Sequence, residues 1–267
     1  MSAVAGGRPG TGLSSLLPRL RELARAALLR SARDHTAAAT ARSCLIVAPH
    51  PDDETLGCGG RILLARRAGQ AVTVLVATDG AASHGADLAG LRAVRRQELA
   101  AATGLLGLSA PDLITLDLPD GSLAAHRAEL VERLVALIDE RRPDEVYATC
   151  RQEAHPDHAA AGLALAEALS RCRHRPRAFE YPIWLWGDWP ISRRWLRRGP
   201  GHWLDLLVRR RARTVRLDGV RAAKQAAIDV YRSQLGAEVA GVAVGLPASV
   251  LARAAAGPEL FFDVSGR

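Results

Sequence analysis

Four short apolar runs, separated by stretches of helical character, constrain this chain more than any other feature of its sequence. The runs lie at residues 44–48 (CLIVA), 71–78 (AVTVLVAT), 113–118 (LITLDL) and 145–149 (EVYAT). Helical patterns follow them at 61–68, 88–107, 124–141 and 159–171. Buried strands that alternate with helices predict an α/β fold with a mostly parallel sheet and helices on both faces. In such sheets, functional side chains collect at the carboxyl ends of the strands.

The charge of the chain is unevenly distributed. Residues 1–42 carry +5, residues 43–192 carry −5 and residues 193–216 carry +8, within a net charge of +8. An acidic centre suits a metal site built from carboxylates, and basic flanks favour an anionic surface or substrate. The four cysteines form no Cys-x-x-Cys pair, and no disulfide framework is expected. Without an N-terminal apolar segment or a run of about 18 apolar residues, we expect a cytoplasmic protein.

We divide the chain into an N-terminal extension (1–42), a core (43–180) and a C-terminal region (181–267) that caps and closes the same domain. Residues 14–33 of the extension have leucines at helical spacing and arginines on the other faces, which predicts an amphipathic basic helix. We expect its leucines to pack on the core. Contact with a membrane surface is the alternative.

The first chemical motif follows the first predicted strand directly, as Pro49-His50-Pro51-Asp52-Asp53-Glu54. Histidine and aspartate are ligands for borderline metals such as Zn²⁺, and two prolines stiffen the loop that carries them. A solvated acidic turn with a capping aspartate is the structural alternative. It does not explain a histidine between two prolines immediately after a buried strand.

The second motif follows the fourth predicted strand, as Glu153-Ala154-His155-Pro156-Asp157-His158. Either histidine alone is more typical of a helix start, but the pair beside Asp157 matches the first motif. If His158 joins His50 and Asp53, three protein ligands leave open positions for water, as in catalytic zinc sites. Asp52 is then free to act as a base, and His155 as an acid or electrostatic stabiliser. The other histidines (His35, His84, His126, His174 and His202) are expected at the surface or in loops.

Together these motifs resemble the PIG-L/LmbE family of zinc-dependent de-N-acetylases, which have an (Ala/Pro)-His-Pro-Asp-Asp-Glu loop and a later His-Pro-Asp-His loop. The resemblance runs from about Cys44 to Leu169, and the segment Lys224–Leu235 resembles the family's later Lys…Tyr-x-Ser-Gln helix. It implies a Rossmann-like three-layer sandwich that removes an N-acetyl group from an amino sugar, in a glycoconjugate, glycolipid or glycosylated metabolite.

The resemblance also implies residue roles. His50, Asp53 and His158 would bind Zn²⁺, and Fe²⁺ suits the same His₂Asp set. Asp52 would take the proton from water and pass it to the leaving amine, while His155, oriented by Asp157, would stabilise the oxyanion. Glu54 would support the site from behind. Arg95, in an Arg95-x-x-Glu98 helix motif, would reach the substrate.

One position departs from the family pattern. Some relatives carry a tyrosine two residues before His-Pro-Asp-His, where this chain has Glu153, so His155 would bear more of the oxyanion stabilisation.

All five tryptophans lie between residues 184 and 203 and overlap the arginine cluster at 193–216. They predict either a helical appendage packed on the core, a cap in which Trp184 and Trp186 stack on a sugar, or a segment that docks on an anionic membrane.

Two other functions compete with the N-deacetylase. A metal-dependent hydrolase of another amide or ester, such as a thiol-conjugate amidase, would use the same motifs. A basic nucleic-acid-binding protein would need no metal, and the acidic centre with its two His/Asp loops argues against it.

Overall fold

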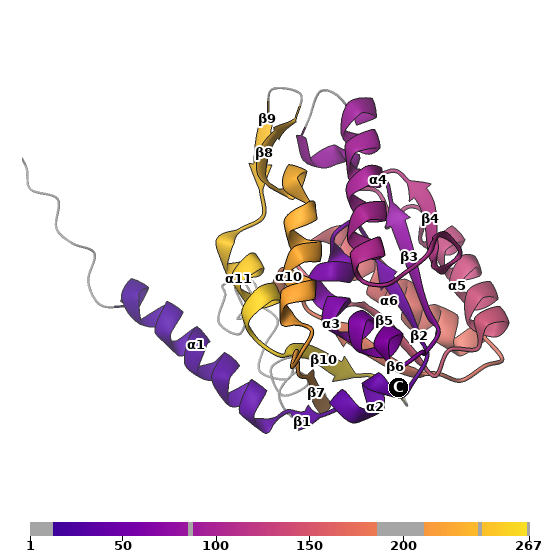
Figure 1. The fold of residues 1–267 in the computed structure, drawn as a ribbon, viewed down its shortest axis with the longest axis horizontal. Helices are drawn as coiled ribbons and strands as arrows, with labels where there is room; N and C mark the ends of the chain where they lie inside the picture. Colours follow the sequence, from indigo (N-terminus) through magenta and orange to yellow (C-terminus); the bar gives the residue numbers. More distant parts are fainter. Residues whose placement is uncertain (1–12, 85–87, 186–210, 240–241, 266–267) are drawn as a thin grey trace, which may run out of the picture.

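The computed structural model describes residues 13–84, 88–185, 211–239 and 242–265 (Figure 1). The helices are α1 (Leu13–Ser31), α2 (Thr36–Thr40), α3 (Asp53–Arg67), α4 (Leu88–Leu105), α5 (Arg127–Arg141), α6 (Pro156–Arg171), α10 (Arg221–Val230) and α11 (Ala248–Ala256). The strands are β1 (Arg33–Asp34), β2 (Cys44–Ala48), β3 (Val72–Thr78), β4 (Leu113–Leu118), β5 (Glu145–Thr149), β6 (Arg177–Tyr181), β7 (Arg211–Val215), β8 (Leu235–Val239), β9 (Val242–Gly245) and β10 (Glu259–Asp263). Short 3₁₀ turns cover Ala81–His84, Ala110–Asp112 and Arg232–Gln234.

One mostly parallel sheet organises the molecule, in the order β1-β7-β10-β6-β5-β2-β3-β4. Of the strands of this sheet that lie in the described residues, only β10 runs antiparallel to its neighbours, β6 and β7. From β2 the chain proceeds to β3 and β4 on one side, and then returns to β5 and β6 on the other. The strand order therefore reverses between β2 and β5, which is the switch point where doubly wound sheets place their sites. The predicted α/β fold is confirmed.

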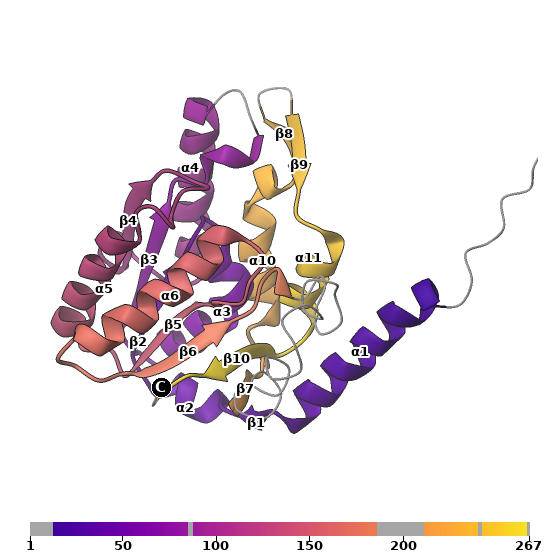
Figure 2. The same ribbon diagram turned by 180° about the vertical axis from the view of Figure 1, so that it is seen from behind.

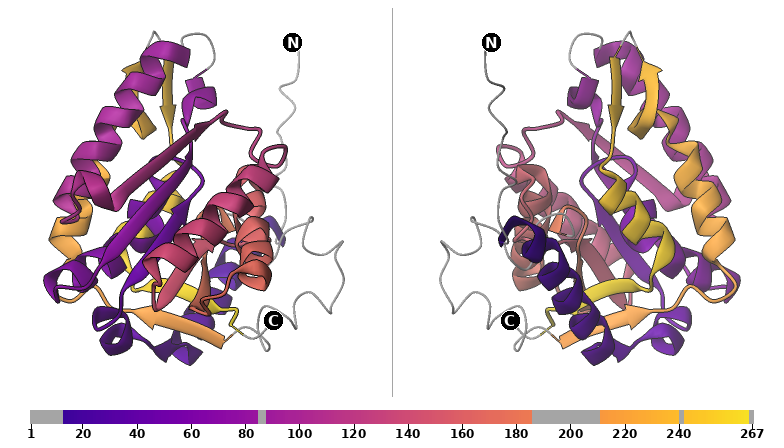
Figure 3. Two further views of the ribbon diagram at one scale, coloured as in Figure 1. Left: turned by 90° about the vertical axis from the view of Figure 1, so that its right-hand side faces the viewer. Right: turned by 90° about the vertical axis from the view of Figure 1, so that its left-hand side faces the viewer.

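Helices cover both faces of this sheet (Figures 2 and 3). Alternate residues of β2 point to opposite faces, as the two-residue period of a strand requires. Ile46 packs in the core cluster that includes Ile62 of α3, whereas Val47 packs in the cluster that includes Leu134 of α5. The site loops thus leave a strand that is buried on both sides.

Helix α3 begins at Asp53, eight residues before the helix expected at 61–68. The glycines that follow the first motif lie inside this helix. A Cβ on Gly57 would stand 2.2 Å from the ring of Tyr181, and one on Gly60 would stand 2.1 Å from Leu217. These glycines let α3 approach the sheet closely, so that its first turn reaches the carboxyl end of β2.

Helix α1 projects from the body of the molecule (Figures 1 and 2). Its Leu28 packs in a cluster with Leu185 and Phe262, as expected. Leu20 and Leu23 are 47% and 66% exposed, so the expectation of core packing is wrong for these two side chains. Among the described residues, no helix is long and apolar enough to cross a membrane.

His35 lies in the loop between β1 and α2, which is one of its two expected places, but its side chain is buried. Its Nε2 lies 2.8 Å from Oε1 of Glu145, at the amino end of β5. The same carboxylate accepts hydrogen bonds from Arg42, Arg61 and the Tyr147 hydroxyl. Burial alone would raise the pKa of Glu145, but the hydrogen bonds from His35 and Tyr147 and the charge of Arg61 lower it to about 2.

Because of Glu145, the free energy of unfolding should therefore depend on pH in the acid range. Because its pKa is lower in the folded chain, its stabilisation is complete above about pH 4.5 and is lost as the pH falls towards about 2. We expect the difference in unfolding free energy between wild type and Glu145→Gln to shrink by up to about 3 kcal/mol over this range. Urea unfolding at stepped pH measures it, and a difference that does not change with pH would contradict the assignment.

Candidate metal centre and active site

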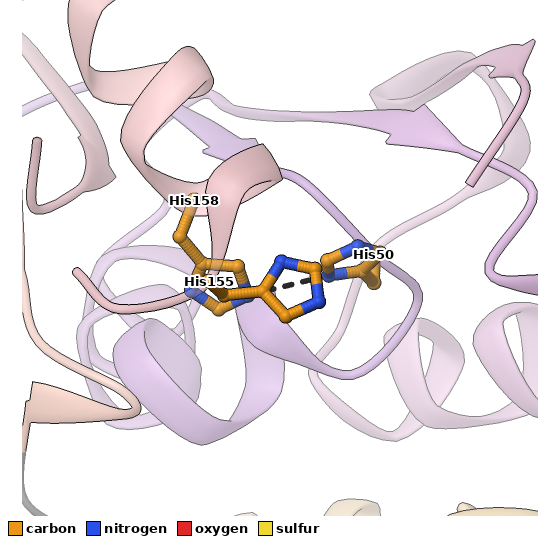
Figure 4. Close-up of side chains that lie close together, drawn as sticks. All are labelled: His50, His155 and His158. Atoms are coloured by element: carbon orange, nitrogen blue, oxygen red, sulfur yellow. Dashed lines mark hydrogen bonds between the residues drawn. The ribbon is translucent and has the colours of Figure 1, made fainter. Parts of the chain in front are cut away.

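The two predicted motifs meet at the switch point of the sheet. His50 follows β2, Asp53 begins α3, and His158 lies in the first turn of α6, which follows β5. The side chains of His50, His155 and His158 point towards one another (Figure 4). Parallel strands that end side by side thus bring together residues more than a hundred positions apart in the chain.

Three donor atoms form a compact triangle. Nδ1 of His50 lies 3.1 Å from Oδ2 of Asp53 and 3.3 Å from Nε2 of His158. The same Asp53 oxygen lies 3.3 Å from Nε2 of His158. Two ligands of a tetrahedral Zn²⁺ are about 3.3–3.4 Å apart when their bonds are about 2.0–2.1 Å long. The sequence-predicted donors therefore have the spacing that such an ion requires.

The second ring nitrogen of His50 faces two carboxylates. Its Nε2 lies 3.1 Å from Oδ1 of Asp120 and 3.3 Å from Oδ2 of Asp157. Asp157 also accepts backbone N–H groups from Gly121 and Leu123, so it is held firmly in place. A carboxylate on the far nitrogen fixes the tautomer of a ligating histidine and raises its basicity. These contacts leave Nδ1 of His50 as the nitrogen available to a metal.

Asp120 is a site residue that sequence reasoning missed. In the sequence, Pro119-Asp120-Gly121 has only the pattern of a turn after a strand. Since β4 is a parallel strand, its carboxyl end lies at the same edge as those of β2 and β5. That rule would have identified Asp120 as a candidate.

The carboxylates and histidine rings of the site shift one another's pKa. Burial would raise the pKa of Asp53, but the nearby rings of His158 and His50 hold it far below its usual range. Burial would lower the pKa of His50, but hydrogen bonds to Asp120, Asp157 and Asp53 hold it well above its usual value. Four aspartates, with Asp52 added to these three, surround the histidines, which suits a divalent cation.

Asp52 lies beside the triangle and outside it. It lines the same cavity as His50 and Asp53, and Nη2 of Arg95 donates to its Oδ2 at 3.1 Å. Burial raises the pKa of Asp52 well above its usual value, although the charge of Arg95 opposes this shift. A carboxylate in this position can exchange protons with a molecule in the cavity.

His155 forms another wall of the cavity. Its ring packs edge-on against His50 and lies parallel to Trp184, with centroids 4.8 and 6.3 Å apart. Burial, together with the neighbouring His158 and His50, lowers the pKa of His155 to about 4, so its ring is neutral at neutral pH. Its Nδ1 is buried without a hydrogen-bond partner, and Asp157 bonds to His50 instead. The implied orientation of His155 by Asp157 is therefore not what the structure shows.

The cavity has a volume of about 200 Å³. Its lining includes the predicted residues His50, Asp52, Asp53, Arg95, His155, His158 and Trp184, together with Ala82, Asp120, Gly121, Gln234 and Leu246. Trp186, the remaining predicted substrate contact, and most of the tryptophan- and arginine-rich segment lie outside the described residues. Glu153 does not line the cavity, and its Oε1 accepts the backbone N–H of Ile183 at 2.6 Å.

The Lys…Tyr-x-Ser-Gln segment supports the site from α10 and the turn after it. Lys224 donates to the carbonyl of Leu56 and to Glu259. The carboxylate of Glu259 also accepts the backbone N–H groups of Gly60 and Arg61 in α3. Tyr231 donates to Glu54, and Gln234 reaches the cavity. Glu54 itself is fully buried, and its carboxylate also accepts the backbone N–H of Asp52.

Fold and donor set together define a Rossmann-like α/β protein with a candidate metal centre at the switch point of its sheet. Residues 45–169 match the family model described as GlcNAc-PI de-N-acetylase, PIG-L. The resemblance seen in the motifs is thus confirmed by a PIG-L family match over this part of the chain.

Curated relatives with deacetylase names match about half of the chain. The probable N-acetyl-alpha-D-glucosaminyl L-malate deacetylase 2 of Bacillus subtilis (strain 168) is 33% identical over 141 residues, which are 50% of this chain and 63% of that protein. The diacetylchitobiose deacetylase of Thermococcus kodakarensis is 30% identical over 138 residues, which are 48% and 49% of the two chains. The match thus spans less than two thirds of the length of these relatives.

Solved structures match most of the chain. The conserved protein TT1542 from Thermus thermophilus has a TM-score of 0.59 at 27% identity, covering 83% of this chain and 94% of its own. The N,N'-diacetylchitobiose deacetylase from Pyrococcus horikoshii has a TM-score of 0.56 at 20% identity, covering 85% and 82%, and shares the fold.

Removal of one donor should destroy the metal site. We expect wild-type protein to bind one Zn²⁺ per chain and His158→Ala to bind none after dialysis against a weak chelator. Asp120→Asn should weaken the affinity about 10-fold, because only the support of His50 is changed. Elemental analysis and competition titration measure this, with His174→Ala as control. Unaltered zinc binding by His158→Ala would contradict the assignment.

Proposed function

We propose that this chain is a zinc-dependent amide hydrolase that removes the N-acetyl group from an N-acetylamino sugar within a larger conjugate. The observation that carries the proposal is the triangle of His50, Asp53 and His158, with Asp52 beside it in one cavity. The PIG-L family match at residues 45–169 supports the same chemistry. Fe²⁺ suits this donor set as well, so the choice of zinc is part of the proposal.

In this reaction water adds to the acetyl carbonyl, the C–N bond breaks, and acetate and a free amine leave. Zn²⁺ held by the three donors would lower the pKa of water and polarise the carbonyl. Asp52 accepts the proton of the attacking water and then gives it to the leaving nitrogen, because an unprotonated amine is a poor leaving group. The neutral ring of His155 places an N–H at the developing oxyanion.

The lining of the cavity supports a sugar conjugate as the substrate. Trp184 offers a flat apolar face, while Arg95 and Gln234 supply hydrogen-bond donors. Relatives are named for GlcNAc-malate, diacetylchitobiose and a GlcNAc-inositol, so their substrates share N-acetylglucosamine joined to a second group. We therefore propose an N-acetylglucosamine conjugate, with the second group left to substrate profiling.

The proposed reaction predicts metal-dependent release of acetate. Wild type, loaded with Zn²⁺, should release acetate from at least one member of a panel of N-acetylglucosamine conjugates. Asp52→Asn should lower kcat by about 10²–10⁴-fold, because a carboxamide cannot take the proton. A coupled acetate assay measures both. If metal-loaded wild type releases acetate from none of the conjugates but hydrolyses another amide or ester, the N-deacetylase assignment is wrong.

Peripheral contact with an anionic membrane is a second part of the proposal, and α1 supports it. Leu20 and Leu23 stand three residues apart on α1 and are both exposed, which gives the described part of this helix an exposed apolar strip. Exposed Arg19 and Arg30 lie on the same helix. The helix's Glu22 is paired with Arg25 and Arg253. An apolar stripe among cations fits the interface of an anionic bilayer.

This contact predicts binding to vesicles. Wild type should float with vesicles of phosphatidylcholine and phosphatidylglycerol, and less so at high salt, because part of the attraction is electrostatic. Leu20→Glu/Leu23→Glu should abolish flotation. Leu105→Glu, at a leucine that is 50% exposed on α4, is the matched control. Equal flotation of all three proteins, or dimerisation through α1 without flotation, would refute the membrane contact.

A further inference from the structure

The backbone of Asp52 has an unusual conformation. Its φ and ψ are 135° and −32°, whereas the other described non-glycine residues with positive φ, Asp117 and Arg142, have φ of 53° and 47°. Those two lie in the ordinary left-handed region, but Asp52 lies beyond it. Such a conformation is strained and persists only where the surroundings enforce it.

One restraint on Asp52 comes from its backbone hydrogen bonds, and its carbonyl accepts the N–H groups of Thr55 and Leu56 at 3.0 and 2.9 Å. Its N–H donates to Oε2 of Glu54 at 3.0 Å. The other oxygen of Glu54 accepts the hydroxyl of Thr55 at 2.6 Å and the hydroxyl of Tyr231. Since Glu54 is fully buried, these donors determine where its carboxylate points. Tyr231 is the only one of the three that comes from outside the loop and first turn of α3.

A second restraint acts on the side chain. Nη2 of Arg95 donates to the carbonyl of Pro51 at 2.5 Å and to Oδ2 of Asp52 at 3.1 Å. One turn later on α4, Glu98 accepts both the N–H and the hydroxyl of Ser233, at 2.8 and 2.6 Å. Residues 231–233 therefore contact both elements that restrain Asp52.

We propose that Tyr231 is a positioning residue that, through Glu54, holds Asp52 in its strained conformation with the carboxylate facing the metal centre. The Tyr231 hydroxyl fixes the Glu54 carboxylate, and that carboxylate fixes the N–H of Asp52. Without the hydroxyl, Glu54 can turn, the Asp52 N–H loses its acceptor, and the backbone relaxes. The carboxylate then leaves the position from which it exchanges protons. The role in catalysis rests on the proposed deacetylase function.

Tyr231→Phe tests this directly, because it removes one hydroxyl and keeps the ring. We expect kcat to fall about 10- to 100-fold, the effect of misplacing a reacting group by about 1 Å, while KM and zinc affinity stay unchanged. The matched control is Tyr147→Phe, which removes another buried hydroxyl that donates to a buried glutamate, Glu145, at the amino end of β5. The control should match wild type in kcat. Equal kcat losses in both variants, or none in Tyr231→Phe, would overturn the proposal.

Substitutions at Glu54 add a test by conservative replacement. In Glu54→Gln the amide oxygen can still accept the Asp52 N–H, while its NH₂ donates to the Tyr231 and Thr55 hydroxyls. Glu54→Leu has no acceptor. We therefore expect the kcat of Glu54→Gln to be at least ten times that of Glu54→Leu. Similar kcat values in the two variants would overturn the proposal that Tyr231 acts through Glu54.

A structure of Tyr231→Phe provides a readout that needs no turnover. We expect φ of Asp52 to move to a negative value. An unchanged φ near its wild-type value would overturn the proposal even in an active enzyme. Relaxation of φ in a protein whose wild type releases no acetate would instead uphold the positioning and refute the proposed reaction.

Discussion

The close approach of two imidazole nitrogens to one carboxylate oxygen is the interaction on which the rest of this structure depends. Nδ1 of His50 and Nε2 of His158 both lie close to Oδ2 of Asp53 and to each other. Either ring nitrogen can donate an N–H to the Asp53 oxygen, but if both are protonated the two N–H groups crowd each other, because the nitrogens are 3.3 Å apart. A divalent cation that took one lone pair from each of the three atoms would remove this crowding, which makes the triangle a candidate metal centre.

Strand pairing, helix packing and hydrogen bonds all contribute to the position of this triangle. Strands β2 and β5 pair in parallel, which brings the ends of two loops together at the switch point. Small residues let helices begin close to those ends: a Cβ on Gly57 of α3 would overlap Tyr181, and one on Gly162 of α6 would stand 2.5 Å from the carbonyl of Thr149. Asp120 and Asp157 then fix the ring of His50, while Arg95 and Glu54 fix Asp52.

Local patterns in the sequence were enough to predict the central strands, the doubly wound class and the donors of the triangle. The apolar runs at 44–48 and 145–149 became β2 and β5 within the predicted bounds. The strands β6, β7 and β10 were not predicted, because charged residues interrupt them. Those charges are paired across the fold, as when Asp263 of β10 accepts from Arg177 of β6.

The other features that the sequence did not reveal have a similar cause. Asp120 has the local sequence of a turn, and only the topology of the sheet brings it to His50. His35 has no motif around it, and only the sheet register places it against Glu145. The early start of α3 could not be seen locally, since three glycines disfavour a helix by themselves and are tolerated where close packing requires them. Contacts between residues far apart in the chain thus determine these positions, which local sequence patterns do not reveal.

Anomalous scattering at the zinc absorption edge, from crystals of the metal-loaded protein, tests the central claim most directly. The account predicts one peak within bonding distance of His50 Nδ1, Asp53 Oδ2 and His158 Nε2, with Asp52 close by but not coordinated. A principal peak elsewhere, such as between Asp120, Asp157 and the other nitrogen of His50, would contradict it.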